Sequence, residues 1–476
     1  MLQVVSAPFA QRIGIVIEHP GSGGAEDVSL KGLKKTRMAT LSNICIVTKV
    51  WESGTAWYAR ELARGLIELG VRVALVAPAF KPSELELDLT DDQQSLFLRR
   101  KTTREDNSNP NKIFRYWSKL LRILDGVIAV IRLRSRFKIY LFSMPDPIIS
   151  PVLFLLLRLS GARVLLVVHD PFPHGLTITE RNNWLLRLKL KILYLTPSAL
   201  IILTEGGKKV VNQQFGVNLS KIFPIPHPGF GSIVEEPIEG TGRLLVFGSI
   251  RPNKNILEVI LAVKQARLRW PTLRLHIAGN PGGGNEAYWA TCLAAIQDDP
   301  AAFVIDARFI QESEIPGIIA DSDAFVLAYQ NFESQSGVAV LAGLSGRPVI
   351  ATGMDGFLEL QQQGLVMFQI PGKGTPADIV AGIEKLQIAS LTQLREQTSN
   401  GELRLQHSLS VKRVASLVLD CQTVLKHDPE SCSTFSIRTC SKSLNQSASF
   451  SLTRFHVIGK RSDAGFNASL LSTHAR

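Results

Sequence analysis

Hydrophobic positions along the chain alternate between two patterns. Mostly apolar runs such as NICIVTKV (residues 43–50) and VRVALVAP (residues 71–78) predict buried strands. Between them, SGTAWYARELARGLIELG (residues 53–70) has the spacing of an amphipathic helix, and Gly70 is a typical helix end. Apolar strands that alternate with helices predict a parallel sheet covered on both faces.

The alternation stops once and then starts again. A Pro- and Gly-rich stretch without a period predicts an interdomain linker over residues 226–242. The sequence therefore predicts an α/β protein of two Rossmann-like doubly wound domains, residues 42–225 and residues 243–426, which face a central cleft. The remaining predicted strands are KIYLFS, ARVLLVVHD and ALIILT before the linker, and RLLVFGSI, LRLHIAGN, AFVIDARFI, AFVLAYQ and RPVIAT after it.

The two ends of the chain differ from this pattern. Residues 1–41 have no clear period and predict a flexible N-terminal extension. Residues 427–476 are rich in Ser and Thr, basic and aperiodic, which predicts a disordered tail.

Composition limits which cellular compartment and which binding partners are expected. The formal net charge is +12, which favours an anionic partner or else a solvated basic surface. The longest apolar stretch, PIISPVLFLLL (residues 147–157), is too short for a spanning helix and predicts a buried one. The N-terminus lacks a basic head followed by an apolar core and is a poor signal peptide, so we expect a protein in the cytoplasm or peripheral on the cytoplasmic face of the membrane. Cysteine spacing predicts no disulfide framework and no structural metal; the cysteines are Cys45, Cys292, Cys421, Cys432 and Cys440.

Residues 99–138 hold many more Lys and Arg residues than acidic ones, interleaved with apolar segments such as VIAVIRL. Such basic amphipathic surfaces bind anionic lipid headgroups, which makes an anionic membrane surface a candidate partner. The alternative is a pair of ordinary packed helices with solvated charges. Nucleic acid is not an expected partner, because no zinc-ligand spacing and no RNA-binding aromatic motif occurs.

The stretch FGSIRPNKN (residues 247–255) is the first candidate site. A predicted strand ends at Gly248, and Arg251 and Lys254 follow in the turn before a helix. Two cations beside a helix N-terminus suit a diphosphate. The alternative is an ordinary strand-to-helix loop with solvated charges.

Two further candidates precede the linker. Gly54 lies in the turn SGTAW, where a helix N-terminus is expected to face the cleft. His169 and Asp170 follow a strand in VVHDPFPH, at the strand end where ligands of α/β sheets bind. A histidine there could move protons or donate to an oxyanion, or it could simply cap the strand end.

The stretch YQNFESQSGVAVLAGLSGRPVIAT (residues 329–352) places polar residues between a strand and an apolar helix. Ser336, Gly337 and Val338 open a helix that is expected to run to Leu344, and its free N–H groups would hold a phosphate. Glu333 can accept hydrogen bonds from sugar hydroxyl groups, or it can be an acid stabilised by the helix dipole.

Taken together, the motifs resemble those of the GT-B glycosyltransferases of the family 4 (group 1) type. The resemblance covers about residues 41–425 and rests on the order and spacing of loose motifs. The matching pieces are SGTAWYARELARGL, VVHDPFPHG, ALIILTEGGKK, FGSIRPNKN, LHIAGN, DSDAFVLAYQNFESQSGVAVLAGLSGRPVIAT and Glu359.

The resemblance implies a nucleotide-diphospho-sugar donor. Lys254 and Arg251 would face the diphosphate, and Glu333 would touch donor-sugar hydroxyls. The other implied donor-binding residues are Gly54, Gly248, Ser336, Gly337 and Val338 around the phosphates and sugar, and Gly279, Asn280, Phe309 and Ile310 around the base, while His169 would sit near the reacting carbon.

Two positions depart from the family pattern. A second glutamate, which holds the ribose in the family, is replaced by Leu341, and the usual arginine after FG is Ser249. No Asp-x-Asp stands at a site-like strand end, since DSD at residues 321–323 precedes a strand and fits a surface better. We therefore expect a transferase that needs neither metal nor cofactor.

The stereochemistry of the reaction, its acceptor and the alternatives to a transferase stay open at this point. Retention is weakly favoured; inversion would need His169 or Asp170 as the base. The expected acceptor is a glycan or glycolipid in cell-surface polysaccharide biosynthesis. The alternatives are a non-catalytic GT-B scaffold of a glycan assembly complex and a GT-B sugar-nucleotide epimerase.

Overall fold

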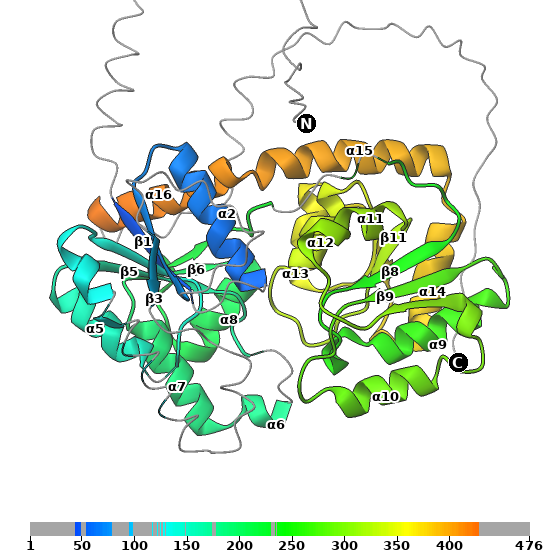
Figure 1. Cartoon of the computed structure of the whole chain (residues 1–476), viewed down its shortest axis with the longest axis horizontal. Coiled ribbons are helices and arrows are strands. Elements are labelled where there is room, and N and C mark those ends of the chain that lie inside the picture. The colour runs from blue at the N-terminus through cyan, green and yellow to red at the C-terminus, as the bar shows by residue number, and fades with distance from the viewer. Residues whose placement is uncertain are drawn as a thin grey trace, which may run out of the picture. The chain divides into compact units, whose positions relative to one another are not determined.

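A computed structural model describes most of the chain (Figure 1). All described residues belong to one compact unit, Met1–Cys432. The expectations for residues 1–41, for most of residues 99–138 and for the tail after residue 427 lie outside the described part. The described residues are 43–48, 54–78, 95–98, 117, 121, 124, 127, 128, 130–147, 149–173, 178–229, 234 and 236–427.

The N-terminal domain is built on a seven-stranded parallel sheet of order β3-β2-β1-β4-β5-β6-β7. β1 lies between β2 and β4, and its first residue, Ile44, is aligned with Val73 of β2 and with Ile139 of β4. The strands are β1 (Ile44–Val47), β2 (Val73–Pro78), β3 (Ser95–Leu98), β4 (Ile139–Phe142), β5 (Arg163–Val168), β6 (Ala199–Ile202) and β7 (Ile222–Pro224).

The C-terminal domain has a six-stranded parallel sheet of order β10-β9-β8-β11-β12-β13. Its strands are β8 (Arg243–Phe247), β9 (Arg274–Ala278), β10 (Phe303–Asp306), β11 (Ala324–Leu327), β12 (Val349–Thr352) and β13 (Met367–Ile370). In both sheets the order reverses beside the first strand, between β1 and β4 and between β8 and β11. Such a switch point at the carboxyl ends of parallel strands is where α/β proteins bind ligands.

Helices cover both sheets. In the N-terminal domain they are α2 (Gly54–Glu68), α5 (Ser150–Leu159), α6 (Ile178–Arg181), α7 (Trp184–Leu195) and α8 (Glu205–Phe215). Those that follow are α9 (Ile256–Arg267), α10 (Glu286–Ala294), α11 (Ile315–Ala320), α12 (Gly337–Leu344), α13 (Asp355–Gln363), α14 (Pro376–Gln387), α15 (Leu391–Ser408) and α16 (Val411–His427). The predicted fold class, two doubly wound α/β domains, is confirmed.

Three strands were not predicted. β7 is only three residues long and ends in proline, and β3 is a four-residue edge strand, so neither gives a clear period. β13 is a four-residue edge strand whose central residues are a partly buried phenylalanine and an exposed glutamine, so its apolar signal is weak. Each of the three lies at an edge of its sheet, where fewer residues need to be apolar on both faces.

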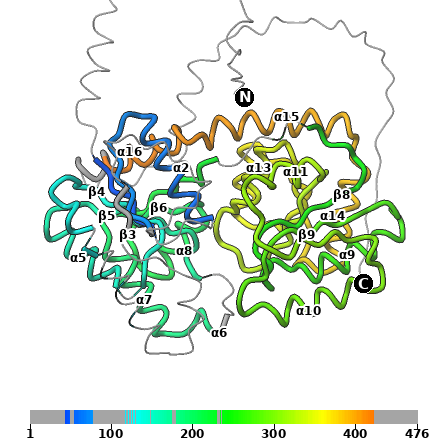
Figure 2. The backbone as a smooth tube through the Cα atoms, in the orientation of Figure 1, coloured from blue at the N-terminus to red at the C-terminus, as the bar shows by residue number. Residues whose placement is uncertain are grey.

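The last helix returns to the first domain. α16 packs on α2, and Figure 2 shows the chain crossing from α15 to that position. A Cβ atom on Gly65 of α2 would lie 2.2 Å from the Val411 carbonyl oxygen of α16. Only glycine allows this approach, so the contact between the two helices depends on residue 65.

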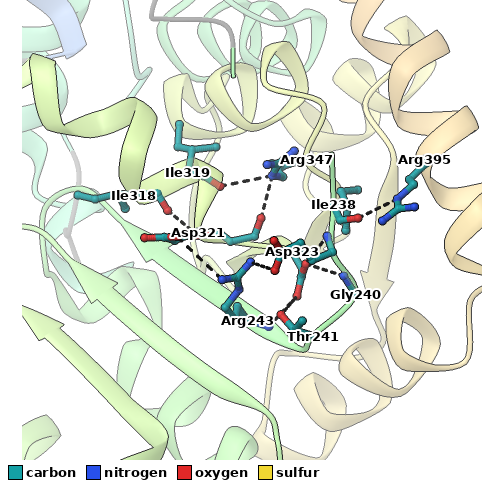
Figure 3. A network of polar contacts seen from close by, with 12 residues as sticks. Ile238, Gly240, Thr241, Arg243, Ile318, Ile319, Asp321, Asp323, Arg347 and Arg395 are labelled. Atoms are coloured by element: carbon teal, nitrogen blue, oxygen red, sulfur yellow. Dashed lines mark hydrogen bonds and ion pairs between the residues drawn. The ribbon is translucent and has the colours of Figure 1, made fainter. Parts of the chain in front are cut away.

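Asp323 joins the end of the linker to the C-terminal sheet (Figure 3). Its side chain is only 3% exposed, so the expectation that DSD fits a surface is wrong for this residue, although Asp321 is exposed. The burial is tolerated because both carboxylate oxygens accept hydrogen bonds. The donors are Glu239 N, Gly240 N, Thr241 Oγ1 and Arg243 N.

Residues 150–157 of the predicted apolar helix lie in α5, as expected, but α5 is buried on one side only. Leu153, Phe154 and Leu157 of α5 enter the core of the N-terminal domain. The opposite side of α5 is apolar and open to solvent, with Leu159 77% exposed. A run that is apolar all round predicts burial but cannot say which side is covered.

Candidate functional site

The loop after β8 brings a lysine back over the end of its own strand. The short helix Pro252–Lys254 turns the chain, and Lys254 Nζ donates to the Phe247 carbonyl oxygen at 3.0 Å. A Cβ on Gly248 would lie 3.1 Å from this nitrogen, and Gly248 has a φ of 87°. Glycine at residue 248 therefore leaves room for the lysine at the switch point.

A second glycine holds the neighbouring loop against the first. A Cβ on Gly279 would lie 2.0 Å from the Gly248 carbonyl oxygen, and the φ of Gly279 is 153°. Ile250 N donates to the Asn280 carbonyl oxygen at 2.9 Å, so the loops after β8 and β9 are joined through their backbones. The Asn280 side chain is exposed and accepts from Gly282 N.

The start of α12 lies beside this pair of loops. Ser336 is the N-cap, and its Oγ accepts from Ala339 N at 3.3 Å. The amides of Gly337 and Val338 have no hydrogen-bond partner among the described residues, as expected for the first turn of a helix. Val338 Cγ2 lies 3.6 Å from the position of a Cβ on Gly248. Two free amides and a lysine thus lie close together.

The Lys254 side chain has a pKa near neutrality, so its charge depends on whether an anion is bound between it and the start of α12. Loss of hydration, and then the positive charge of Arg251, lower the pKa of Lys254 to about 7. The ammonium also lies 5.5 Å from the centre of the Tyr329 ring. An anion would stabilise the protonated lysine, so the arrangement suits a phosphate or diphosphate.

The other residues expected around the donor are placed differently. Arg251 is exposed at the start of the same turn. Phe309 leaves its ring 43% exposed, but the Ile310 side chain belongs to the core beside β8 and β11. Leu341 is also a buried core residue, and its apolar side chain cannot accept a hydrogen bond from a ribose hydroxyl.

Glu333 forms an ion pair with an arginine from the other domain. Arg181, the last residue of α6, donates from Nη1 to Glu333 Oε1 at 2.8 Å and from Nη2 to the Asn331 carbonyl oxygen at 3.0 Å. Among the described residues, none donates a hydrogen bond to Glu333 Oε2. One carboxylate oxygen is thus paired with Arg181, and the other is buried without a hydrogen bond among the described residues. Sequence analysis missed Arg181, because nothing local marks the end of a four-residue helix.

The two residues after Glu333 also bind the N-terminal domain. Ser334 donates through Oγ to the carbonyl oxygen of His169, and the Gln335 side chain accepts from His227 N. Thr204 Oγ1 donates to the Glu333 carbonyl oxygen at 3.4 Å. Residues 333–335 therefore form a polar seam that brings His169 and Asp170, at the end of β5, towards the C-terminal domain.

Aromatic rings line the N-terminal side of this seam. The Tyr58 ring from α2 lies edge-on to His169 and to His227, with ring centroids 5.1 Å apart in each case. Burial lowers the pKa of His227 to about 4, although hydrogen bonds with the backbone of Pro228 and Gly54 oppose the effect. His227 is neutral at physiological pH, and Gly54 lies at the start of α2 beside it.

Two more glutamates hold the domains together near the seam. Glu312 accepts from Arg60 Nη2 at 2.7 Å and from the Trp57 indole. Glu359 of α13 accepts from the amides of Glu205 and Gly206 at the start of α8, each at 3.2 Å. Burial raises the pKa of Glu359, and those two hydrogen bonds oppose the rise.

A polar pocket opens next to the seam on the C-terminal domain. Its volume is about 450 Å³, and Asn331 at its edge is two residues from Glu333. Tyr329, Thr352 and Ile370 line it at the ends of β11, β12 and β13. Within the described residues no cluster of three or more His, Cys, Asp or Glu could hold a metal, and no helix could cross a bilayer.

Comparison with solved structures defines the class. Sucrose-phosphate synthase from Thermosynechococcus elongatus matches with a TM-score of 0.60 and 13% identity over 81% of this chain and 99% of that one. HepE from Anabaena, in complex with UDP and glucose, matches with a TM-score of 0.58 and 15% identity over 80% and 99%. A TarM mutant from S. aureus, in complex with UDP, alpha-GlcNAc-glycerol and Fondaparinux, has a TM-score of 0.59 and 11% identity over 80% and 99%. The fold is that of the GT-B glycosyltransferases.

The sequence assigns the family. The family described as Glycosyltransferase Family 4 matches residues 53–228, and the family described as Glycosyl transferases group 1 matches residues 241–387. The chain belongs to the GT-B glycosyltransferases of this group 1, family 4-like kind, so the expected family is confirmed. Among curated protein sequences none matches the chain.

Proposed function

We propose that this glycosyltransferase moves a sugar from a nucleotide-diphospho-sugar to a glycan or lipid-linked acceptor in cell-surface polysaccharide biosynthesis. One observation carries the donor part: Lys254, the backbone of Gly248 and the free amides of Gly337 and Val338 converge at the switch point of the C-terminal sheet. The UDP and UDP-glucose held by HepE and the UDP held by TarM support a nucleotide donor.

In the proposed reaction the bond between the sugar and the diphosphate breaks, and negative charge develops on the leaving phosphate oxygens. Lys254 and the helix amides stabilise that charge where it forms, with Arg251 at the edge. These groups can supply the positive field themselves, so metal and cofactor independence belong to the proposal. Glu333 would accept from donor-sugar hydroxyls through its unbonded Oε2.

Stereochemistry is part of the same proposal. We favour retention of configuration, with His169 supporting the donor sugar from the N-terminal side of the seam. In an inverting reaction His169 or Asp170 would have to take the acceptor proton. Proton NMR of the first-formed product distinguishes the two outcomes. The proposal places the reaction in the cytoplasm, where nucleotide sugars are expected.

A thermal-shift panel with UDP-, GDP- and ADP-sugars tests the donor site. One nucleotide sugar should raise the melting temperature of the wild type, because a ligand that binds the folded state stabilises it by mass action. Lys254→Ala and Glu333→Ala should shift much less. Lys385→Ala, a matched lysine on α14 whose Nζ bonds only a backbone carbonyl, should behave like the wild type.

One observation favours a second candidate function. Leu341 is only 1% exposed and stands where the family holds ribose with a glutamate, so a non-catalytic scaffold of the same fold is the alternative. If no nucleotide sugar shifts the wild type, the scaffold is favoured and the donor site is abandoned. Complete loss of turnover in EDTA, restored by Mn²⁺, would contradict metal independence.

A further inference from the structure

The outer surface of α7 is apolar although the helix already buries its other side. Leu190, Leu193 and Tyr194 point into the core of the N-terminal domain. On a helix that turns by about 100° per residue, Trp184, Leu188, Ile192 and Leu195 form one stripe on the opposite side, with Leu185 at its edge. All five are 45% exposed or more, and Trp184 is 69% exposed.

The neighbouring helix repeats this arrangement. On α5 the exposed residues are Val152, Leu155, Leu156 and Leu159, at the spacing of a single helical stripe. α5 and α7 pack against each other on the same core of the N-terminal domain (Figure 2). Both stripes lie opposite the buried sides of their helices, so both face away from the core that the helices share. We call these two stripes together the outer face.

Charge on the outer face has one sign. By helical geometry Lys191 lies at one edge of the α7 stripe and Lys189 at the other. In the part of the chain that the structure describes, neither lysine has an ion-pair partner. Neither helix contains an acidic residue, and α5 adds the exposed Arg158.

We propose that the outer face of α5 and α7 docks on an anionic lipid bilayer. An apolar stripe between lysines matches the boundary of a bilayer, where side chains enter the acyl region and ammonium groups stay among the phosphates. A protein partner would need acidic groups to match the lysines, whereas an anionic lipid surface supplies both parts of the match. The net charge of +12 adds attraction at longer range.

This docking deepens the proposed function, which leaves open whether the acceptor is lipid-linked, and it extends the expected membrane contact from residues 99–138 to α5 and α7. The two regions adjoin, since Val130 belongs to the same core cluster as Phe154 and Leu193. Ile128 and Ile131 are about half exposed there. Docking requires no turnover, so it can fail while the donor site stands, and the reverse also holds.

Vesicle flotation with the full chain tests the proposal. Wild type should float with vesicles of equimolar phosphatidylcholine and phosphatidylglycerol, and much less with pure phosphatidylcholine. L188Q/I192Q should lose most of this binding. K189Q/K191Q should lower the partition coefficient on the anionic vesicles roughly tenfold or more, from the contribution of each lysine at such a surface.

The matched control is L268Q/I388Q, which changes equally apolar residues on the C-terminal domain that are 87% and 70% exposed. It should float like the wild type. An unchanged melting temperature for L188Q/I192Q shows that lost flotation is not lost folding. The proposal is overturned if the wild type does not float with anionic vesicles, or if L188Q/I192Q floats with them as well as the wild type does. So does a lipid-free wild-type dimer that L188Q/I192Q turns into a monomer, because the face would then bind a second copy.

Discussion

The N-terminal and C-terminal sheets share the order of their first six strands, but their surroundings differ. In the C-terminal domain the strand ends carry close-packed glycines, a lysine and free amides, and the exposed apolar residues Leu268 and Ile388 stand at the ends of α9 and α14. In the N-terminal domain such residues gather on α5 and α7. Figure 1 labels both helices. One fold thus presents a strand-end site in one copy and an apolar outer face in the other.

The comparison teaches that the same architecture separates two tasks. Strand order fixes where a switch point lies, but the residues there decide whether it can bind an anion. Helix packing fixes which side of a helix is inside, but it places no demand on the outer side. An apolar outer side is therefore evidence of contact beyond the domain.

The largest expected effect concerns the contact between the two glycine loops of the C-terminal site. Gly279→Ala should lower the free energy of unfolding by about 3 kcal/mol, because the new Cβ meets the Gly248 carbonyl oxygen in a backbone conformation that alanine resists. Urea denaturation measures the change. Gly283→Ala, four residues on, is the control: it has open space around it and should stay within about 0.5 kcal/mol. Equal effects of the two variants would contradict the close approach of the loops.

The meeting of candidate residues at the C-terminal strand ends could be predicted from local patterns, whereas the contacts of the seam could not. Lys254, Gly248 and Val338 come from two motifs whose local pattern predicts a strand end and a helix start, and parallel strands bring those ends together. Arg181 has no such pattern. Its contact with Glu333 spans 152 residues and two domains, and only the folded chain shows it.

The outer face shows a different limit of the sequence. The apolar run in α5 correctly predicted a helix, because its residues suit one and Pro151 lies in its first turn. It could not predict which side is covered, since Leu153 and Leu155 have the same chemistry and only packing distinguishes them.

A middle-sized effect should follow from the pKa of about 7 of Lys254. A nucleotide sugar keeps both phosphates ionised, so it selects the protonated lysine and raises its pKa. Affinity should be constant below about pH 7 and fall by up to about tenfold per pH unit above it. Titration calorimetry in two buffers of different ionisation enthalpy should show proton uptake on binding near neutral pH.

Lys254→Arg is the control for this pH dependence. A guanidinium stays charged over this range, so any binding that remains should no longer weaken with rising pH. Wild-type affinity that is the same at about pH 6 and about pH 9 would mean that the lysine is protonated without the ligand. The geometry of the C-terminal site would then stand, but ligand binding would not be coupled to protonation of Lys254.

The smallest expected effect is on stability, and it tests most directly whether the outer surfaces of the two domains differ. L188Q/I192Q should change the free energy of unfolding by no more than about 0.5 kcal/mol, since both side chains are about half exposed and belong to none of the core clusters of the described residues. The same variant should elute much earlier from a phenyl matrix, and the shift should be larger than for L268Q/I388Q, because it interrupts a stripe of exposed apolar residues on one helix, whereas L268Q/I388Q replaces single residues at two helix ends. A large loss of stability in L188Q/I192Q would show that another part of the chain covers α7 in solution. The outer face would then be interior, and the two domains would differ only at their strand ends.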